Sequence, residues 1–276
     1  MIPKGSILRA VIRLLAYVMV TILLLPFQVL SVIGGLRFSR RLPIFYHKLC
    51  MKILGIDVAV HGTRTDIRPV LFVGNHTSYL DIPILGSVIM GSFVAKSEIA
   101  NWPVFGWLAK LQRTVFIERR AVRAADQRDE IGARLQAGDR LILFPEGTSN
   151  DGTRVLPFKS ALFAVAERRI EDEPLLVQPF TIAYTQIDGR PMKFDWRALV
   201  AWYGDMPLMP HLWTVLGIGH IHAEIWFHDP VTIEGLIEGA PSRKALAEYC
   251  HQTVAKGLDG ANEGATLLDS SEANVT

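Results

Sequence analysis

Short apolar segments alternate with helix-type patterns along the central part of the chain. The apolar segments have the length of buried strands and lie at 70–73, 92–95, 114–117, 141–144, 175–184 and 221–227. Helical patterns lie between them, notably at 121–137 and 158–169. This alternation is typical of an α/β domain with a substantially parallel sheet. We therefore expect residues 56–240 to form one domain, with a mixed, largely parallel sheet flanked by helices.

The first 55 residues carry most of the excess apolarity of the chain. Residues 14–33 contain no charge, and a run of about twenty apolar residues is long enough to cross a bilayer. Residues 39–55 show apolar positions three or four apart among basic ones, which is typical of an amphipathic helix in the head-group layer. Two arrangements stay open: one spanning helix, or a bent helical pair that enters one leaflet. Basic residues flank the apolar run at both ends, so they do not determine its orientation.

The C-terminal part, residues 241–276, has a different character. Residues 242–257 predict a short helix that begins after Pro241. Residues 258–276 are mostly small or polar, with few large apolar groups. We expect them to form a flexible tail without a catalytic role.

The composition of the chain supports a membrane-associated protein but does not indicate a particular partner. The chain is 50% hydrophobic with a mean hydropathy of +0.25, which is rather apolar for a soluble domain. The formal net charge of +2 favours no particular partner, and we expect no nucleic acid. Cys50 and Cys250 lie far apart and form neither a disulfide framework nor a metal-binding pattern. A reducing compartment is the simplest interpretation.

Candidate chemistry follows two of the apolar segments. His76 follows the segment at 70–73 after Gly74 and Asn75, and Asp81 lies five positions beyond His76. On one regular helix these two side chains would be about 140° apart, so they meet only if His76 lies in the loop and Asp81 in the first turn of the next helix. Asp81 can then hold one imidazole nitrogen and leave the other to accept a proton. The alternative is that this segment is only a turn and a helix cap.

Four motifs together resemble those of the glycerolipid acyltransferase family, whose best-known activity is acylation of 1-acylglycerol 3-phosphate. The His-x-x-x-x-Asp motif corresponds to His76 and Asp81, and the Phe-Pro-Glu-Gly-Thr motif matches residues 144–148 without substitution. Residues 113–120 resemble the family's second motif, an apolar strand ending in arginine, and residues 176–180 resemble the fourth. The motifs occur in the right order over residues 70–185, and this combination is far more specific than any one of them.

The resemblance implies a role for each site residue. His76 would take the proton of the acceptor hydroxyl as that hydroxyl attacks an acyl thioester, and Asp81 would orient His76. The residues that would contact the acceptor or donor are Arg119, Glu146, Gly147, Thr148 and Lys159. Arg119 suits a phosphate or carboxylate, and Glu146 would orient Arg119 or bind a hydroxyl. This chemistry implies no metal and no cofactor, with acyl carrier protein or coenzyme A thioester as the co-substrate.

A cluster of imidazoles near the end of the chain offers a metal site as an alternative. In a strand, His220, His222, Glu224 and His228 would share one face, and His-x-His with a glutamate can bind zinc. Trp226 interrupts this face, and no second ligand cluster accompanies it. A half-exposed strand face is the better interpretation.

The expected function is therefore transfer of a fatty acyl group to a lysolipid hydroxyl at the cell membrane, with the catalytic domain on the cytoplasmic side. The acceptor is expected to be 1-acylglycerol 3-phosphate. Residues 148–152 and 201–206 look closer to bacterial relatives that acylate lyso-ornithine lipid, which stays the alternative. Arg119, Arg120, Arg123 and Arg128 would suit an acidic carrier protein. A membrane-tethered lipid-binding protein without turnover is the alternative of another class.

Overall fold

An eight-stranded sheet forms the centre of the computed structural model, which describes residues 3, 5–118, 124–170, 172–236 and 241–273. The strand order is β1-β10-β8-β2-β5-β3-β4, and β9 pairs with β8 beside this path. The strands are β1 (Ile56–Gly62), β2 (Val70–Gly74), β3 (Ser92–Lys96), β4 (Val115–Ile117), β5 (Arg140–Leu143), β8 (Leu176–Ile187), β9 (Arg190–Pro191) and β10 (Ile221–Phe227). Along the path only β10 and β8 pair antiparallel. This confirms the predicted α/β class with a mixed, largely parallel sheet.

All six apolar segments form strands, namely β2, β3, β4, β5, β8 and β10. The side chains of β2 and β5 are buried on both faces, because helices cover both sides of a parallel sheet. The pattern of apolar positions did not reveal β1, whose residues are mostly half-buried or exposed. It also missed a two-stranded sheet of β6 (Arg169–Ile170) and β7 (Glu173–Pro174).

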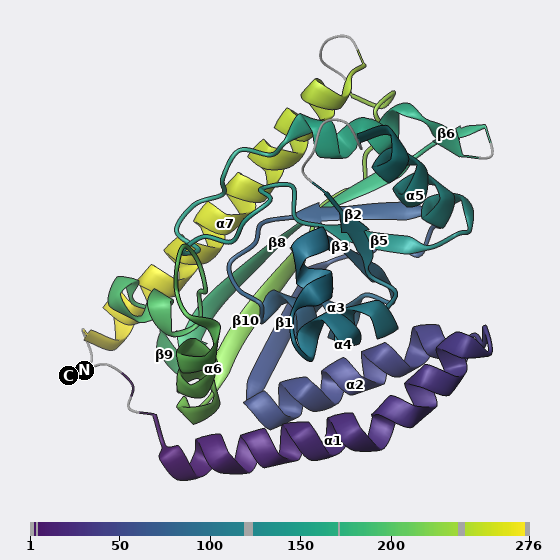
Figure 1. The fold of residues 1–276 in the computed structure, drawn as a ribbon. Helices are drawn as coiled ribbons and strands as arrows, with labels where there is room; N and C mark the ends of the chain where they lie inside the picture. The colour runs from purple at the N-terminus through teal and green to yellow at the C-terminus, as the bar shows by residue number, and fades with distance from the viewer. Residues whose placement is uncertain (1–2, 4, 119–123, 171, 237–240, 274–276) are drawn as a thin grey trace.

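Helices lie on both faces of the sheet (Figure 1). They are α3 (Asp81–Val88), α4 (Phe105–Leu111), α5 (Ala124–Gln136), α6 (Leu208–Gly217) and α7 (Arg243–Ala273), with 3₁₀ segments η1 (Ser97–Asn101), η3 (Ser160–Glu167) and η4 (Phe194–Leu199). One core cluster joins α3 and α6 to one face, and a second joins α5, η3 and α7 to the other. The pattern at 121–137 corresponds to α5, whereas the pattern at 158–169 folds as the 3₁₀ segment η3.

The C-terminal helix is much longer than predicted. It continues from Arg243 to Ala273, so the expected flexible tail after residue 257 is helical to that point. Val254, Leu258, Ala261 and Ala265 are buried at spacings of three and four residues. Alanines that pack against a sheet carry little hydrophobicity of their own, and this explains why the sequence looked like a tail.

The N-terminal segment forms two antiparallel helices, α1 (Ile7–Ile33) and α2 (Phe38–Leu54), along one side of the domain (Figure 1). The amphipathic helix predicted at 39–55 is confirmed as α2. It buries Leu42, Met51 and Leu54 and packs between α1 and α3. By length and composition α1 could cross a membrane, and only 6% of its most apolar window is buried.

Both ends of α1 are attached to the rest of the protein. Near its start, the Arg13 guanidinium donates hydrogen bonds to the carbonyls of Ile218 (2.6 Å) and Gly219 (2.8 Å), just beyond α6. Near its end, Gln28 Nε2 donates to the carbonyl of Leu111 in α4 (2.7 Å). The face of α1 that points away from the domain exposes large apolar side chains at Ile7, Leu8, Ile12, Leu15, Met19, Ile22, Leu23, Phe27, Leu30 and Ile33. Such a surface indicates membrane association.

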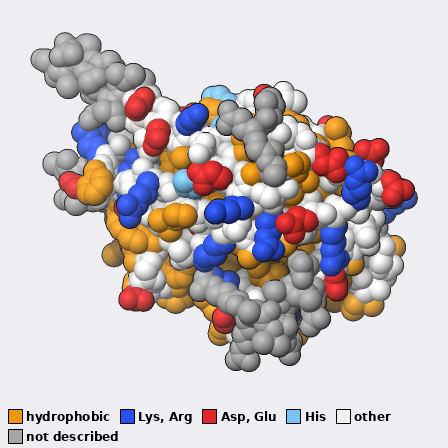
Figure 2. All heavy atoms as spheres, turned by 90° about the horizontal axis from the view of Figure 1, so that it is seen from above, with side chains coloured by type: hydrophobic (Ala, Val, Ile, Leu, Met, Phe, Trp, Pro, Cys, Tyr) orange, Lys and Arg blue, Asp and Glu red, His pale blue; other side chains and the backbone are white. Residues whose placement is uncertain are grey.

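The opposite side of the molecule differs from this apolar surface. Figure 2 shows that face, on which basic and acidic side chains are mixed with smaller apolar areas. The apolar side chains of α1 therefore lie on one side of the domain, and a surface rich in charged side chains lies on the other.

Candidate active site

The site begins where β2 ends, in a loop fixed by two residues before the histidine. Gly74 lies against Phe180, and a side chain at Gly74 would place its Cβ 2.3 Å from that ring. Asn75 extends the pairing of β2 with β8: its side chain donates to the carbonyl of Ile182 (2.8 Å) and accepts from the N–H of Ile182 (2.9 Å). The side-chain amide thus replaces a strand hydrogen bond and fixes the direction in which the chain leaves the sheet.

His76 and Asp81 meet as the spacing predicted. His76 lies in the loop, Asp81 is the first residue of α3, and His76 Nδ1 is 2.7 Å from Asp81 Oδ2. The imidazole is 22% exposed and Asp81 is fully buried. The imidazole of His76 also stacks on the ring of Phe144, with ring centroids 4.1 Å apart. Since the carboxylate accepts from Nδ1–H, Nε2 keeps its lone pair and is available as a proton acceptor.

Asp81 is held by more than the histidine. Its Oδ2 also accepts from the backbone N–H groups of Thr77 (2.8 Å) and Ser78 (3.0 Å), and its Oδ1 accepts from the hydroxyl of Tyr184 (2.6 Å). Burial, together with the nearby Asp81 carboxylate, raises the pKa of Tyr184 well above its usual value, so the hydroxyl stays a donor. Tyr184 lies in the predicted strand at 175–184, but nothing in the sequence assigned it to the site.

Glu146 supports the catalytic loop from the second motif. Its Oε1 accepts from the N–H of His76 (2.7 Å), and its Oε2 accepts from the Asn150 amide (2.6 Å) and the N–H of Leu156 (2.9 Å). The side chain is 2% exposed, and burial raises its pKa to about 7. The N–H of Asn150 donates in turn to the carbonyl of His76 (3.0 Å). These contacts fix the histidine loop, and the expected role of Glu146 at the acceptor head group stays a prediction.

Two of the other predicted substrate-binding residues, Gly147 and Lys159, lie next to each other. Gly147 adopts a positive φ of 69°, and a side chain there would place its Cβ 2.5 Å from Lys159 Nζ, so the turn and the ammonium group are neighbours. Thr148 and Lys159 are both exposed. Arg119 lies outside the described residues, as do Arg120, Arg123 and the side chain of Arg128, so their predicted roles stay predictions.

An aromatic group borders the histidine loop. The N–H of Trp202 donates to the carbonyl of Thr77 (3.0 Å), which attaches the segment at 201–206 to the loop. The rings of Tyr79 and Trp102 each make an edge contact with Trp202, with centroids 6.0 and 6.1 Å apart. These partly exposed rings give the site an apolar border.

The imidazoles of the proposed metal face are used in other ways. The face of β10 that carries His222, Glu224 and Trp226 is half-buried, as predicted. Glu224 contacts His61 (2.9 Å), and His228 contacts the hydroxyl of Thr181 (2.8 Å). Among the described residues, no group of three or more His, Cys, Asp and Glu is placed to hold a metal ion.

Comparison with known proteins assigns the family. A family model described as Acyltransferase matches residues 57–183. The lyso-ornithine lipid O-acyltransferase of Brucella abortus (strain 2308) is 42% identical over 267 residues, which cover 95% of this chain and 98% of that protein. The chain belongs to the acyltransferase family. It is therefore an acyltransferase enzyme, and a lipid-binding protein without turnover is no longer a candidate.

Two further similarities complete the comparison of this acyltransferase. It is 32% identical to the 1-acyl-sn-glycerol-3-phosphate acyltransferase of Neisseria gonorrhoeae over 198 residues, which cover 70% of this chain and 73% of that protein. Its fold resembles the crystal structure of the 1-acyl-sn-glycerophosphate acyltransferase PlsC from Thermotoga maritima, with a TM-score of 0.51 and 23% identity, over 90% of this chain and 97% of that one. The structural similarity supports the fold, and the sequence similarities support the family.

Proposed function

We propose that this acyltransferase moves a fatty acyl group from an acyl thioester to the free hydroxyl of a lysolipid. The observation that carries the proposal is the contact between His76 and the buried Asp81, which leaves the second imidazole nitrogen as a base in a partly exposed position. In the proposed step His76 Nε2 takes the hydroxyl proton as the oxygen attacks the thioester carbonyl. The C–S bond then breaks, and the proton passes from His76 to the thiolate.

The proposal needs no metal and no further cofactor. The acyl group passes directly from sulfur to oxygen, so the protein supplies a base, an orienting carboxylate and positioning. Tyr79, Trp102 and Trp202 border the histidine loop and would contact the apolar part of a lipid substrate.

The arrangement of α1 supports a one-leaflet attachment. Both ends of the helix are bonded to the domain, through Arg13 at one end and Gln28 at the other. A helix held along the domain exposes its apolar side to a membrane without crossing it. We place the enzyme at the cytoplasmic face of the cell membrane, where acyl carrier protein and coenzyme A thioesters are available.

Lyso-ornithine lipid is the acceptor that the comparisons favour. The Brucella abortus relative is named for that substrate and matches nearly the whole chain at 42% identity. The Rhizobium meliloti (strain 1021) relative carries the same name and is 39% identical over 251 residues. The Neisseria gonorrhoeae relative, named for 1-acylglycerol 3-phosphate, is more distant at 32%. This reverses the order of the two acceptors expected from the sequence.

Acyl transfer by the purified full chain in detergent tests the proposal. Labelled acyl carrier protein thioester or acyl-coenzyme A is offered with lyso-ornithine lipid or 1-acylglycerol 3-phosphate. We expect product with lyso-ornithine lipid, and product with 1-acylglycerol 3-phosphate alone would reject the preferred acceptor. His76→Ala should lose about 10²- to 10⁴-fold in kcat, the usual contribution of a general base. His220→Ala, at a half-exposed histidine that pairs with Asp57, is the matched control and should keep the wild-type rate. Full turnover by His76→Ala would reject the mechanism.

A further inference from the structure

A pocket lies at the end of the sheet opposite to His76. Its lining includes residues at the amino ends of three neighbouring strands: Arg68 before β2, Ser92 in β3 and Arg140 in β5. The pocket has a volume of about 390 Å³, including solvent at its mouth. His76 follows the carboxyl end of β2, and at about 3.3 Å per residue the strands separate the two sites by about 15 Å. The pocket is therefore not part of the acyl-transfer site.

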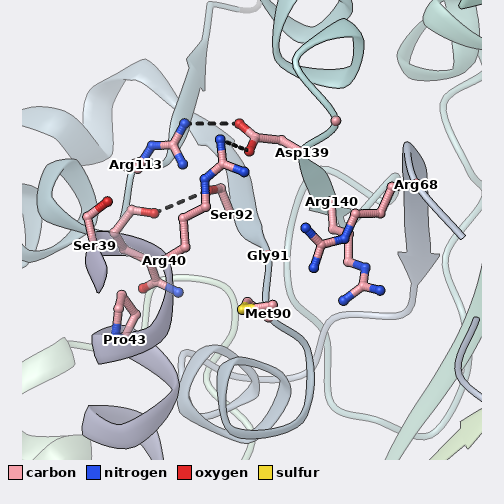
Figure 3. Close-up of a pocket in the computed structure, with 12 residues that line it drawn as sticks. Ser39, Arg40, Pro43, Arg68, Met90, Gly91, Ser92, Arg113, Asp139 and Arg140 are labelled. Atoms are coloured by element: carbon pink, nitrogen blue, oxygen red, sulfur yellow. Dashed lines mark hydrogen bonds and ion pairs between the residues drawn. The ribbon is translucent and has the colours of Figure 1, made fainter. Parts of the chain in front are cut away.

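Arginines dominate the lining of this pocket. Arg40, Arg68, Arg113 and Arg140 line it, and Asp139 is the one acidic residue among the lining residues. Figure 3 shows Arg40 and Arg113 near Asp139 on one side, with Arg68 and Arg140 together on the other. These side chains come from α2, from the segment before β2, from the turn before β4 and from β5. Four cationic groups thus converge from parts of the chain that are distant in sequence.

The nearby carboxylates do not balance this charge. Asp139 pairs with Arg40 (3.2 Å), Arg113 (3.1 Å) and Arg134 (2.6 Å). Asp66 pairs with Arg64 (3.1 Å) and Arg140 (3.0 Å), but it is 80% exposed. Within the described part of the chain, Arg68 has no ion pair. Five arginines therefore share two aspartates, and Arg68 adds a sixth positive charge.

Arg140 supplies an independent indication of an anion-binding site. Its side chain is 5% exposed, and among the described residues its buried Nε has no hydrogen-bond partner. Burial lowers the pKa of Arg140, and the positive charges of Arg68 and Arg64 lower it further. Arg140 Nη2 donates to the carbonyl (2.9 Å) and the carboxylate (3.0 Å) of Asp66, but that carboxylate is 80% exposed. An anion in the pocket would accept from the unused Nε donor and offset the like charges beside it.

We propose that this pocket binds a phosphate group. Phosphate oxygens accept hydrogen bonds from several guanidinium groups at once, and a planar arginine fork fits two of these oxygens. Arg68 and Arg140 on one side and Arg113 on the other would donate to it. Arg40 belongs to α2, so a bound phosphate would also attach the N-terminal helix pair to the edge of the sheet.

The phosphate has two possible sources, a phospholipid head group and free phosphate. Leu36 in the turn between α1 and α2 (55% exposed) and Phe38 at the start of α2 (48% exposed) lie close in sequence to Arg40. Apolar side chains next to a cationic pocket are typical of a surface that contacts an anionic lipid. The test therefore has one arm for each source.

Binding of two probes to the purified full chain tests the proposal. Inorganic phosphate is titrated calorimetrically at constant ionic strength. Vesicles of phosphatidylcholine, with and without phosphatidylglycerol, are compared by flotation, since α1 alone would attach the protein to both. We expect saturable binding to phosphate, tighter binding to the anionic vesicles, or both. Arg68→Gln should weaken that binding about tenfold or more, because one charge-assisted donor is lost.

Matched variants separate the pocket from general surface charge. Arg68 and Arg190 are both exposed, so Arg190→Gln makes the same charge change at β9, far from the pocket, and should bind like wild type. Arg41→Gln removes an exposed charge beside Arg40 but outside the pocket lining. His76→Ala should also bind normally, so failure of the catalytic proposal stays distinguishable. The proposal is wrong if neither probe binds saturably, if Arg68→Gln binds like wild type, or if Arg41→Gln weakens binding equally.

Discussion

Replacing Asp81 by asparagine removes a charge from the centre of the site while keeping the size of the side chain. The amide oxygen can occupy the position of Oδ2 and accept from His76, Thr77 and Ser78 as the carboxylate does. The amide nitrogen then occupies the position of Oδ1, where the Tyr184 hydroxyl can turn and accept from it. The tautomer of His76 and the shape of the loop are therefore kept, and the lost charge is the main change.

The magnitude follows from the geometry. When His76 takes a proton it becomes a cation beside Asp81, whose Oδ2 is 2.7 Å from Nδ1. Two unit charges with centres about 4 Å apart interact by about 4 kcal/mol at an effective dielectric constant of about 20. Loss of this stabilisation in the transition state corresponds to about a thousandfold decrease in kcat. The KM for the lysolipid should change little, because Asp81 is buried and does not contact the substrate.

The assay measures kcat, KM and thermal unfolding for Asp81→Asn and Asp81→Ala. Alanine leaves the N–H groups of His76, Thr77 and Ser78 without their acceptor, at about 1–3 kcal/mol for each buried group. Asp81→Ala should therefore unfold at a clearly lower temperature, whereas Asp81→Asn should lose activity with a small change in stability. Wild-type kcat in a folded Asp81→Asn protein would refute the electrostatic role of Asp81.

Three further predictions concern the groups around this centre. Burial raises the pKa of Glu146 from 4.5 to about 7. The Glu146 proton is therefore bound more tightly in the native state than in the unfolded state. The contribution of Glu146 to the free energy of unfolding should fall as pH rises from about 4.5 to about 7. Urea unfolding from pH 5 to pH 8 should show this trend, and Glu146→Gln should reduce the slope and lower stability by about 1–3 kcal/mol through its mismatched hydrogen bonds. Arg13→Met should cost about 2 kcal/mol in thermal unfolding through the lost bonds to the end of α6, while vesicle binding persists. Gly147→Ala should lower the free energy of unfolding by about 1 kcal/mol because Gly147 has a positive φ. The added Cβ should also displace Lys159 and raise the KM for the lysolipid, and an unchanged KM would argue against a substrate contact at Lys159.

Local spacing predicted the parts of the site that are close in sequence. The five-residue separation of His76 and Asp81 allowed a contact only with one residue in a loop and the other in the first helical turn, and α3 begins at Asp81. The apolar segments predicted six strands because strands buried on both faces are continuously hydrophobic. The sequence pattern failed where burial was partial, as in β1, or where alanines packed a helix, as in α7.

The contacts that complete the site depend on chain segments far apart. Glu146 lies 70 residues from His76, and Tyr184 lies 103 residues from Asp81, so only the pairing of β2 with β5 and β8 brings them together. The arginine pocket likewise needs α2, the segment before β2, and β5 to converge. The sequence by itself determined the chemical groups, the α/β class and the apolar N-terminus, because these depend on residue type and short periodicity. The tertiary structure decided that Glu146 braces the loop, that Tyr184 holds the carboxylate, and that α1 lies along the domain, because sheet pairing and burial set which distant groups meet.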